Sequence, residues 1–301
     1  MNPQISVVIP AYNHERFIGP AIESVLSQSV QDFEIVIVDD GSTDKTADVI
    51  KTYADPRIHY TWQENQDAFN TINRAMKQAR GEWISILNSD DVYAPDRFEK
   101  MLAFCESENH VAAISNVIPI SDDGDEFRDP GFGWNQWHKK NRDVYFELQD
   151  IYAAFLHGNF MVTTSNLFMK RDVVEAVGDF CSLRYLHDYD YIFRVMLAFP
   201  NQIGYLHDDK LLFYRIHDGN TLSEAAILGR EQDLQVIETY MLRKLPEEYR
   251  DYVATGSRRL RDLENELHAV RAELNQMQSG PTVVPSLPRR IASRVKRAVF
   301  G

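Results

Sequence analysis

The stretch that decides the fold is Trp83-Ile84-Ser85-Ile86-Leu87-Asn88-Ser89-Asp90-Asp91. Its first half is a short apolar run after Gly81, which is typical of a buried strand. The carboxylates of Asp90 and Asp91 follow where this strand should end. Carboxyl ends of strands in open α/β sheets bind ligands, and oxygen donors there suit Mg²⁺ or Mn²⁺ on a phosphate-bearing ligand. The same pair would also fit a solvated turn before a helix near Pro95, so this stretch alone leaves both interpretations open.

Further strands and helices alternate on the amino-terminal side of this stretch. Apolar runs predict strands, and apolar residues at helical spacing follow each of them. The strands are 5–10, 35–38 and 58–62, and the helices are about 17–26, 47–53 and 66–79. This alternation predicts an α/β fold with a doubly wound, mostly parallel central sheet, right-handed crossovers and flanking helices. Strand 35–38 also ends in a carboxylate pair, Asp39-Asp40, and two such pairs at one edge indicate a ligand site.

The bulk composition excludes several classes of protein. The chain has 301 residues, 44% of them hydrophobic, which suffices for one large α/β domain with appendages. The net charge of −13 argues against nucleic-acid binding. Cys105 and Cys181 lie far apart, so neither a disulfide framework nor a zinc site is expected, as in a reducing cytoplasm. We expect no signal peptide and no membrane span, and therefore a cytoplasmic protein that is soluble or peripheral on the inner face of the cell membrane.

Three motifs together resemble the amino-terminal signatures of family 2 glycosyltransferases. They are SVVIPAYN at 6–13, VDDGSTD at 38–44 and LNSDD at 87–91. The resemblance implies the Rossmann-like GT-A fold over residues 1–222, with a nucleotide-binding half to about 111 and an acceptor half over 112–222. It also implies an inverting enzyme of bacterial cell-envelope polysaccharide type. Such an enzyme moves one sugar from a nucleotide-diphosphate sugar, usually UDP-linked, to a hydroxyl of a glycan or lipid-linked glycan.

The resemblance assigns residues of the first half to the nucleotide. The loop after the first strand would lie along the nucleotide, one acid would contact the base, and a later helix would approach the phosphates. Asn88 stands where the metal motif of the family has its first acid, so it would bond a ribose hydroxyl instead. The residues assigned in this way are Pro10, Ala11, Tyr12, Asp39, Asn73, Arg74 and Asn88.

The metal ligands and the general base follow from the same resemblance. Asp90 matches the metal-binding acid, and His217 matches the closing Arg-x-His signature, so the implied cofactor is Mg²⁺ or Mn²⁺. Asp188 matches the general base in a box at the start of a helix. His187 occupies the position of an acid in that box. Asp190 is expected to cap the helix or hold a neighbouring loop.

Weaker assignments place further residues on the acceptor or sugar side. Each has a structural alternative. The tryptophans would form a sugar-stacking wall or anchor a surface loop, and the serine and asparagine would contact a sugar or make strand-end hydrogen bonds. The arginine would pair with a phosphate. The residues are Asp91, Trp134, Trp137, Ser165, Asn166 and Arg215.

A second function remains open at this stage. The departures at Asn88 and His187 would fit a non-catalytic GT-A scaffold or binding protein in an envelope-polysaccharide assembly complex. Retention of four residues together favours the enzyme, namely Asp39, Asp90, Asp188 and His217. No tryptophan follows the Gln-x-x-Arg-Trp pattern of processive synthases in this family, which predicts addition of single sugars.

The carboxyl-terminal third departs from this domain. Residues 223–256 predict a helical extension, and leucines spaced by three and four over 257–278 predict a short coiled-coil-like helix. This helix would form a homodimer seam or dock on its own domain, and we favour self-association. A Pro-rich linker, 279–288, precedes the segment 289–301, which carries five basic residues and no acid. That segment predicts an amphipathic helix on an anionic membrane surface or a solvated tail.

Overall fold

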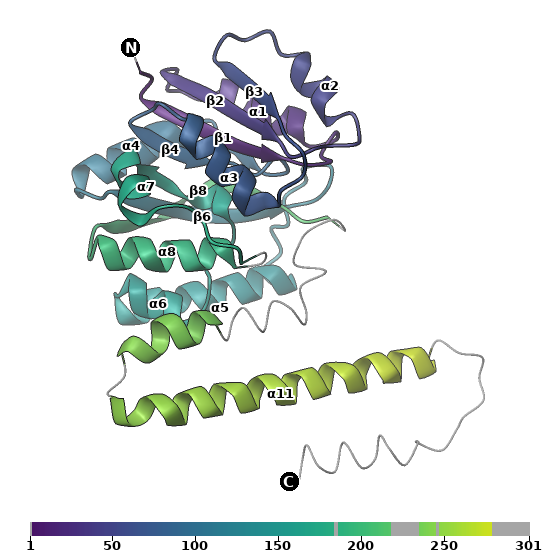
Figure 1. Cartoon of the computed structure of the whole chain (residues 1–301), viewed down its shortest axis with the longest axis vertical. Coiled ribbons are helices and arrows are strands. Elements are labelled where there is room, and N and C mark those ends of the chain that lie inside the picture. The colour runs from purple at the N-terminus through teal and green to yellow at the C-terminus, as the bar shows by residue number, and fades with distance from the viewer. Residues whose placement is uncertain (1, 184–185, 218–234, 245–246, 279–301) are drawn as a thin grey trace. The chain divides into compact units, whose positions relative to one another are not determined.

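The computed structural model describes residues 2–183, 186–217, 235–244 and 247–278 (Figure 1). The chain divides into two compact units, 1–224 and 225–301. The first unit holds an eight-stranded sheet with strand order β3-β2-β1-β4-β7-β6-β8-β5.

The amino-terminal half of the sheet is parallel. It consists of β1 (Ile5–Ala11), β2 (Phe33–Asp39), β3 (Ile58–Trp62) and β4 (Trp83–Ile86). In this half β2 is bonded to β3 on one side and to β1 on the other, and β1 pairs with β4. Every residue of β2 and β4 is buried, which explains their mostly apolar sequences, since a parallel strand is covered on both faces. The predicted α/β fold is confirmed.

Helices connect these strands as the apolar spacing predicts. The connecting helices are α1 (Ile18–Leu26), α2 (Thr46–Lys51) and α3 (Ala68–Gln78). α3 packs on β1 and β2, and its buried apolar residues recur at three- and four-residue spacing. After β4 the chain forms α4 (Arg97–Ser107), which begins just after Pro95 as the sequence indicates.

The carboxyl-terminal half of the sheet is mixed, which differs from a doubly wound parallel sheet. β7 (Phe168–Lys170) is antiparallel to both β4 and β6 (Ala112–Ile120). β8 (Ile203–Arg215) is parallel to β6, and the short β5 (Val92–Tyr93) closes the edge antiparallel to β8. The reversal at β7 follows from a contact between segments far apart in the sequence. The 3-10 turn Thr164–Asn166 lies at the carboxyl end of β4, so the strand that follows it has to run back.

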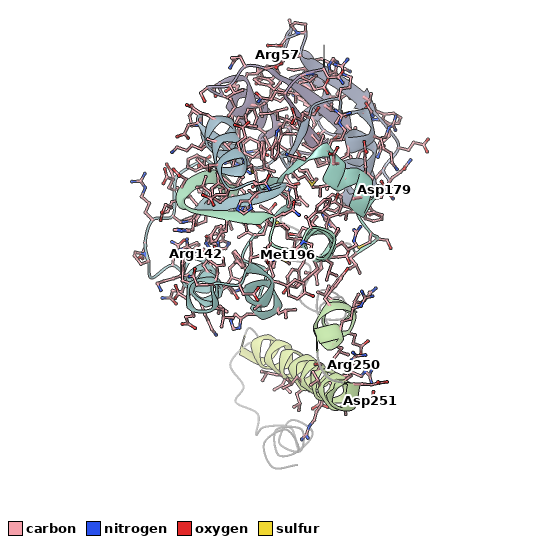
Figure 2. All side chains as sticks on the ribbon, turned by 90° about the vertical axis from the view of Figure 1, so that its left-hand side faces the viewer. Arg57, Arg142, Asp179, Met196, Arg250 and Asp251 are labelled. Atoms are coloured by element: carbon pink, nitrogen blue, oxygen red, sulfur yellow. The ribbon has the colours of Figure 1, made fainter. Side chains whose placement is uncertain are left out.

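Further helices complete the first unit. They are α5 (Gly133–Leu148), α6 (Ile151–His157), α7 (Arg171–Val177) and α8 (His187–Ala198). Figure 1 shows α8 between the β6–β8 part of the sheet and the pair α5–α6. Figure 2 shows side chains throughout this unit, with Arg57 near the parallel strands and Arg142 on the helical layer. The aromatic segment around Trp134 is therefore the first turn of a helix and not the surface loop considered from the sequence.

Gly81 permits the close approach of the chain to β1. A Cβ atom there would lie 2.6 Å from the carbonyl carbon of Ile5 and closer still to the nitrogen of Ser6. We expect Gly81→Ala to lower the free energy of unfolding by about 2–3 kcal/mol, because backbone atoms cannot yield as a flexible side chain would. Gly133→Ala is the control, since a Cβ there meets nothing within 4 Å. Equal urea midpoints for the two variants would contradict this expectation.

The second unit contains a long helix. A π-helical turn (Ile237–Met241) and a 3-10 turn (Leu242–Lys244) precede α11 (Glu247–Gln278). On α11 the side chains of Leu260 and Leu267 are 65% and 51% exposed. None of the described helices has the length and apolar character needed to cross a membrane. The predicted linker and basic tail, 279–301, lie outside the described residues.

Candidate active site

Three loops meet at the carboxyl edge of the parallel strands. The loop after β1 bonds to the loop after β2, because the backbone N–H of Asn13 donates to Ser42 Oγ at 3.0 Å and that of His14 to Thr46 Oγ1 at 2.8 Å. It also bonds to the loop after β4, since His14 Nδ1 lies 2.7 Å from Ser89 Oγ. The two predicted carboxylate pairs therefore follow strands that end at one edge, as expected.

A cluster of possible metal ligands lies in this arrangement. His14, Asp90 and His217 each offer one ligand atom, and these atoms all lie within 4.8 Å of one another. Nε2 of His217 lies 3.1 Å from Oδ2 of Asp90. The structure thus brings together the two predicted metal residues, which lie 127 positions apart in the chain. Sequence reasoning missed His14. The available signal was a histidine directly after the SVVIPAYN motif, in a loop already expected to face the ligand.

The surroundings of Asp90 favour its charged form. Burial by itself would raise its pKa, but the hydrogen bond from His217 and the charges of His14 and His217 outweigh burial and lower the pKa. Asp90 is therefore held as an anion facing two imidazoles. This is a donor set that fits a divalent cation.

Asp91 lies beneath this cluster. Its Oδ2 accepts a hydrogen bond from Ser165 Oγ at 2.6 Å, and its Oδ1 accepts one from the backbone N–H of Arg215 at 3.0 Å. Burial and the neighbouring charge of Asp90 raise the pKa of Asp91 well above its usual value. With 1% of its surface exposed, Asp91 ties β4 to the segments around 165 and 215 and does not line an acceptor surface.

Arg215 bonds to backbone oxygens of the protein, whereas the resemblance predicts that it pairs with a phosphate. Its Nε donates to the backbone oxygen of Asp90 at 2.8 Å. Its Nη1 donates to the backbone oxygens of Ser121 and Asp122 at 2.8 and 2.7 Å. Only 3% of Arg215 is exposed, so it positions the Asp90 loop from below.

Ser165 and Asn166 are also buried within the protein. Both are 0% exposed. Ser165 bonds to Asp91, and the amide of Asn166 bonds to the backbone of Ser115 on β6 and of Met161. Neither side chain reaches the surface in this structure, which favours the alternative of strand-end hydrogen bonds, and the sugar contact stays a prediction. Their observed role is to hold the 3-10 turn against β4 and β6.

Asn88 bonds to the same turn. Its Nδ2 donates to Thr163 Oγ1 at 2.9 Å, and its Oδ1 accepts from Thr164 Oγ1 at 3.0 Å. Both ends of the amide are thus engaged within the protein. The assignment of Asn88 to a ribose hydroxyl stays a prediction.

The other predicted nucleotide residues divide by exposure. Tyr12 is 46% exposed, whereas Ala11 and Asp39 are buried. The carboxylate of Asp39 accepts from Ser42 N at 2.9 Å and from Tyr60 Oη at 3.0 Å. Pro10 is half-buried. Tyr12 is thus the open side chain among these residues, and contact of the others with a base stays a prediction.

Asn73 and Arg74 lie on α3. The Asn73 amide is used twice by the backbone of Phe180, at 2.9 and 2.7 Å. Arg74 Nη1 donates to Gln63 Oε1 at 2.9 Å, and Gln63 Nε2 donates to Asp40 Oδ1 at 2.6 Å. Asn73 therefore ties α3 to the chain before α8, and Arg74 connects to the second acidic motif through Gln63.

Asp188 lies in the first turn of α8. Its Oδ2 accepts from Asn159 Nδ2 at 3.2 Å, and its Oδ1 accepts from the backbone N–H of Tyr189 at 2.7 Å. Burial raises its pKa, and the charge of His187 opposes this only in part. The environment of Asp188 is thus that of a carboxyl group whose proton affinity is increased, as a general base requires.

Asp190 occupies a different environment on the same helix. Its Oδ2 accepts from Arg194 Nε at 2.8 Å, one turn further along α8, and from Cys181 Sγ at 3.1 Å. This is the helix-holding role predicted for it. Of the two carboxylates near the start of α8, that of Asp190 is therefore paired with Arg194, and that of Asp188 bonds to the Asn159 amide.

The two tryptophans of α5 have unequal surroundings. The ring of Trp134 stacks on Tyr214 with centroids 6.0 Å apart and packs against the core. Trp137 is 44% exposed. The structure therefore leaves Trp137 available for the predicted sugar-stacking surface, while Trp134 serves chiefly to anchor the helix.

Comparison with known proteins identifies the family. The model of the family described as Glycosyl transferase family 2 matches residues 6–178, more than half of the chain. The chain is a family 2 glycosyltransferase. An uncharacterised glycosyltransferase of Rickettsia typhi is 28% identical over 258 residues, covering 81% of this chain and 73% of the relative. A putative teichuronic acid biosynthesis glycosyltransferase of Bacillus subtilis, TuaG, is 36% identical over 125 residues, covering 40% of this chain and 50% of the relative.

Solved structures agree with the fold of this glycosyltransferase. The S. aureus protein TarS, residues 1–349 in complex with UDP-GlcNAc, aligns over 84% of this chain and 70% of its own with a TM-score of 0.62 and 20% identity. The mannosyltransferase PcManGT from Pyrobaculum calidifontis, in complex with GDP-Man and Mn²⁺, aligns over 100% of this chain and 81% of its own with a TM-score of 0.60 and 18% identity. At such identities the likeness concerns the fold, and it confirms GT-A.

Proposed function

We propose that this family 2 enzyme transfers one sugar from a UDP-sugar to a hydroxyl group with inversion at the anomeric carbon. The observation that carries the proposal is that the first unit contains both a cluster of possible metal ligands and a candidate general base. A carboxylate and two imidazoles gather at the edge of the parallel strands. A buried carboxyl group with a raised pKa lies on α8. Displacement with inversion needs one such base and no enzyme nucleophile.

The donor set of the His14–Asp90–His217 cluster fits Mn²⁺ better than Mg²⁺. Mg²⁺ prefers oxygen ligands in strict octahedral geometry, whereas two of the three groups here, His14 and His217, offer nitrogen. A divalent cation held by these groups and Asp90 would neutralise the charge that develops on the diphosphate leaving group. Among the structural neighbours, PcManGT was solved with Mn²⁺ and GDP-Man.

The buried carboxyl group on α8 supplies the base. We assign removal of the acceptor proton to Asp188, whose Oδ2 is oriented by Asn159. Its raised pKa brings its proton affinity closer to that of a hydroxyl group losing a proton in the transition state. Asp190 suits this role less well because its carboxylate is paired with the Arg194 guanidinium, whereas the side-chain partner of Asp188 is the neutral amide of Asn159.

Release of the nucleotide diphosphate tests the function. The purified chain is incubated with a panel of UDP- and GDP-sugars, with Mn²⁺, Mg²⁺ or EDTA, and with a preparation of cell-envelope glycans whose hydroxyl groups can receive the sugar. We expect release from a UDP-sugar with Mn²⁺, at least about fivefold slower release with Mg²⁺, and none with EDTA. The rival proposal is a non-catalytic GT-A scaffold in an envelope-polysaccharide assembly complex. Absence of calorimetric UDP binding with either ion would favour the scaffold.

The acceptor is proposed to be a glycan or lipid-linked glycan of the cell envelope. The name of TuaG refers to teichuronic acid biosynthesis, and this supports an envelope polymer. A peripheral position on the inner face of the cell membrane, held by the basic segment 289–301 on anionic lipid, rests on the sequence alone.

The exposed leucines of α11 support the proposed homodimer. Leu260, Leu263 and Leu267 share one helical stripe and are 65%, 38% and 51% exposed. We expect the full chain to be dimeric by light scattering and Leu263→Asp/Leu267→Asp to be monomeric, because a charge opposes burial of this seam. Arg259→Gln, at another exposed position of α11, should stay dimeric. A monomeric parent chain would contradict the proposal.

A further inference from the structure

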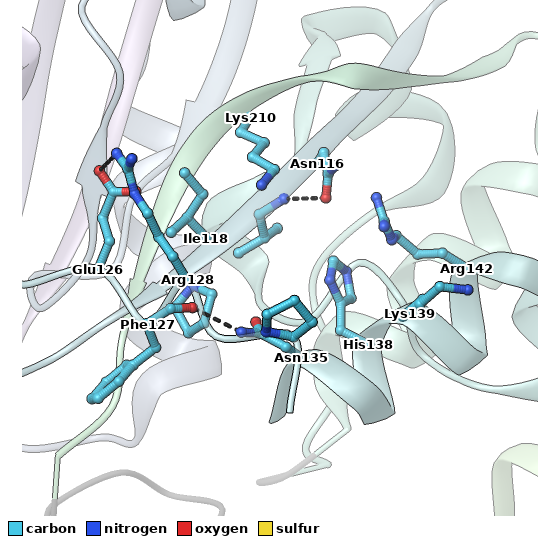
Figure 3. Close-up of a pocket in the computed structure, with 13 residues that line it drawn as sticks. Asn116, Ile118, Glu126, Phe127, Arg128, Asn135, His138, Lys139, Arg142 and Lys210 are labelled. Atoms are coloured by element: carbon cyan, nitrogen blue, oxygen red, sulfur yellow. Dashed lines mark hydrogen bonds and ion pairs between the residues drawn. The ribbon is translucent and has the colours of Figure 1, made fainter. Parts of the chain in front are cut away.

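A cationic cavity of about 500 Å³ lies in the acceptor half, apart from the His14–Asp90–His217 cluster (Figure 3). Its walls come from the end of β6, the segment 126–130, the first half of α5 and Lys210 on β8. Four lining residues carry positive charge, and one, Glu126, carries negative charge. In a chain with a net charge of −13, such a gathering of cations is unusual. The positively charged residues are Arg128, Lys139, Arg142 and Lys210.

Two of these cations already have partners. Arg128 pairs with Glu126 at 2.8 Å, and Lys139 pairs with Asp143 at 2.5 Å. Within the described parts of the chain, Arg142 and Lys210 have no carboxylate oxygen within 4.0 Å. The cavity therefore holds two cations without a direct ion pair among the described residues, although the charge of Glu126 still interacts with that of Lys210.

Arg142 is only partly satisfied by hydrogen bonds. Its Nη1 donates to Tyr205 Oη at 3.3 Å, but its Nε is buried and makes no hydrogen bond among the described residues. A buried guanidinium N–H without an acceptor costs free energy, so the guanidinium of Arg142 is incompletely stabilised by the protein itself. Figure 3 shows Arg142 and Lys210 on adjoining sides of the cavity, with His138 below them.

His138 makes the floor neutral. Only 4% of it is exposed, and Nε2 lies 3.1 Å from the backbone oxygen of Phe160, so the proton is on Nε2 because a carbonyl oxygen can only accept. Burial, with the charges of Arg142 and Lys210, lowers the pKa of His138 to about 4. The positive character of the cavity at neutral pH thus comes from Arg142 and Lys210.

The cavity shares a segment with the base. Phe160, which bonds to His138, directly follows Asn159, the residue that orients Asp188. On its other side, the lining residues Ile118 and Pro119 of β6 pair with Phe213 and Tyr214, just before Arg215. The walls of the cavity are therefore continuous with the elements that hold the His14–Asp90–His217 cluster and Asp188.

We propose that this cavity binds a phosphate or carboxylate group carried by the sugar acceptor, so that the enzyme selects acidic glycans. The proposal rests on the proposed function, because it assigns the ligand to the acceptor. Arg142 would bind the anionic oxygens through its Nη atoms, and Lys210 on β8 would add a point charge. A free anion with no glycan attached is the competing source of the same charge.

Calorimetry in EDTA, without any nucleotide, tests the cavity by itself. The probes are glucose 6-phosphate, inorganic phosphate and glucose, titrated into the full chain. We expect glucose 6-phosphate to bind at least about fivefold more tightly than inorganic phosphate, and glucose not to bind. Arg142→Met/Lys210→Met should weaken glucose 6-phosphate binding by about tenfold or more, because it removes both cations that lack a direct ion pair. Arg142→Lys should lie between the two, since it keeps charge but loses the fork.

Lys140→Met is the matched control, because Lys140 lies on α5 beside Lys139, is exposed and does not line the cavity. It should bind as the parent does. Equal binding by the double variant and the parent would overturn the proposal, and so would inorganic phosphate that binds as tightly as glucose 6-phosphate, which identifies a free-anion site. The two proposals fail separately. Lack of nucleotide diphosphate release from every donor contradicts the enzyme function, whereas the titration concerns only the cavity.

Discussion

Asp188→Asn is expected to lower kcat for sugar transfer by about 10²–10⁴-fold, the range that a positioned general base contributes. The amide has nearly the same shape as the carboxylate, but its single oxygen can accept from only one of the two donors, Asn159 Nδ2 or the backbone N–H of Tyr189. What it loses is the ability to accept the acceptor proton. Donor binding should be unchanged, because Asp188 belongs to α8 and not to the loops that hold the metal ligands. Single-turnover transfer and calorimetric UDP binding measure the two quantities.

Asp190→Asn is the matched control for this substitution. It removes a carboxylate two positions away, but one that is bonded to Arg194 and Cys181. We expect a lower melting temperature and a transfer rate within about threefold of the parent. If the two variants lose activity equally, the assignment of the base to Asp188 is wrong.

The pH dependence gives an independent test of the same residue. The pKa of Asp188 is raised by burial, and a base acts only in its deprotonated form. The acid limb of the kcat/KM profile should therefore lie above pH 4, at a higher pH than an ordinary aspartate would give. As pH falls through this raised pKa, activity is lost. A rate that stays constant down to pH 4 would contradict a base with this environment.

The sequence predicts the parallel half of the fold well. β1, β2 and β4 are short apolar runs buried on both faces, so one-dimensional pattern and three-dimensional environment coincide. The carboxylates that follow β2 and β4 are placed by the same logic, since parallel strands end at one edge. Local pattern is sufficient here because each strand is followed by its own helix.

The sequence predicts the second half less well, because long-range contacts decide it. The reversal at β7 depends on the 3-10 turn docking on Asn88, 77 residues away from Ser165. The burial of Ser165, Asn166 and Arg215 likewise depends on partners far along the chain, and a polar residue at a strand end gives no sign of whether it faces solvent or the core. His14 was missed for a related reason. Its role follows from its proximity to His217, which only the folded chain provides.

The second large effect is expected for Asp90→Asn. The substitution removes the only carboxylate of the His14–Asp90–His217 cluster, and we expect it to lower Mn²⁺-dependent release of nucleotide diphosphate by at least about 10²-fold. Asp90 is held as an anion, so an amide replaces a charged ligand by a neutral one at nearly constant volume. UDP binding should lose its dependence on Mn²⁺, which calorimetry with and without the ion measures. The melting temperature should change little in EDTA, where the charge has no cation to serve.

The histidines separate a metal centre from a structural hydrogen bond. His14→Gln and His217→Gln should each weaken Mn²⁺ binding by about tenfold or more, because each removes one nitrogen ligand. His157→Gln, at an exposed position on α6, is the control and should bind Mn²⁺ as the parent does. If His217→Gln alone weakens binding, His14 is a partner of Ser89 and not a ligand. If neither substitution changes Mn²⁺ affinity, the hydrogen bonds of the cluster only hold the segment after β8 in place, and the cation binds elsewhere.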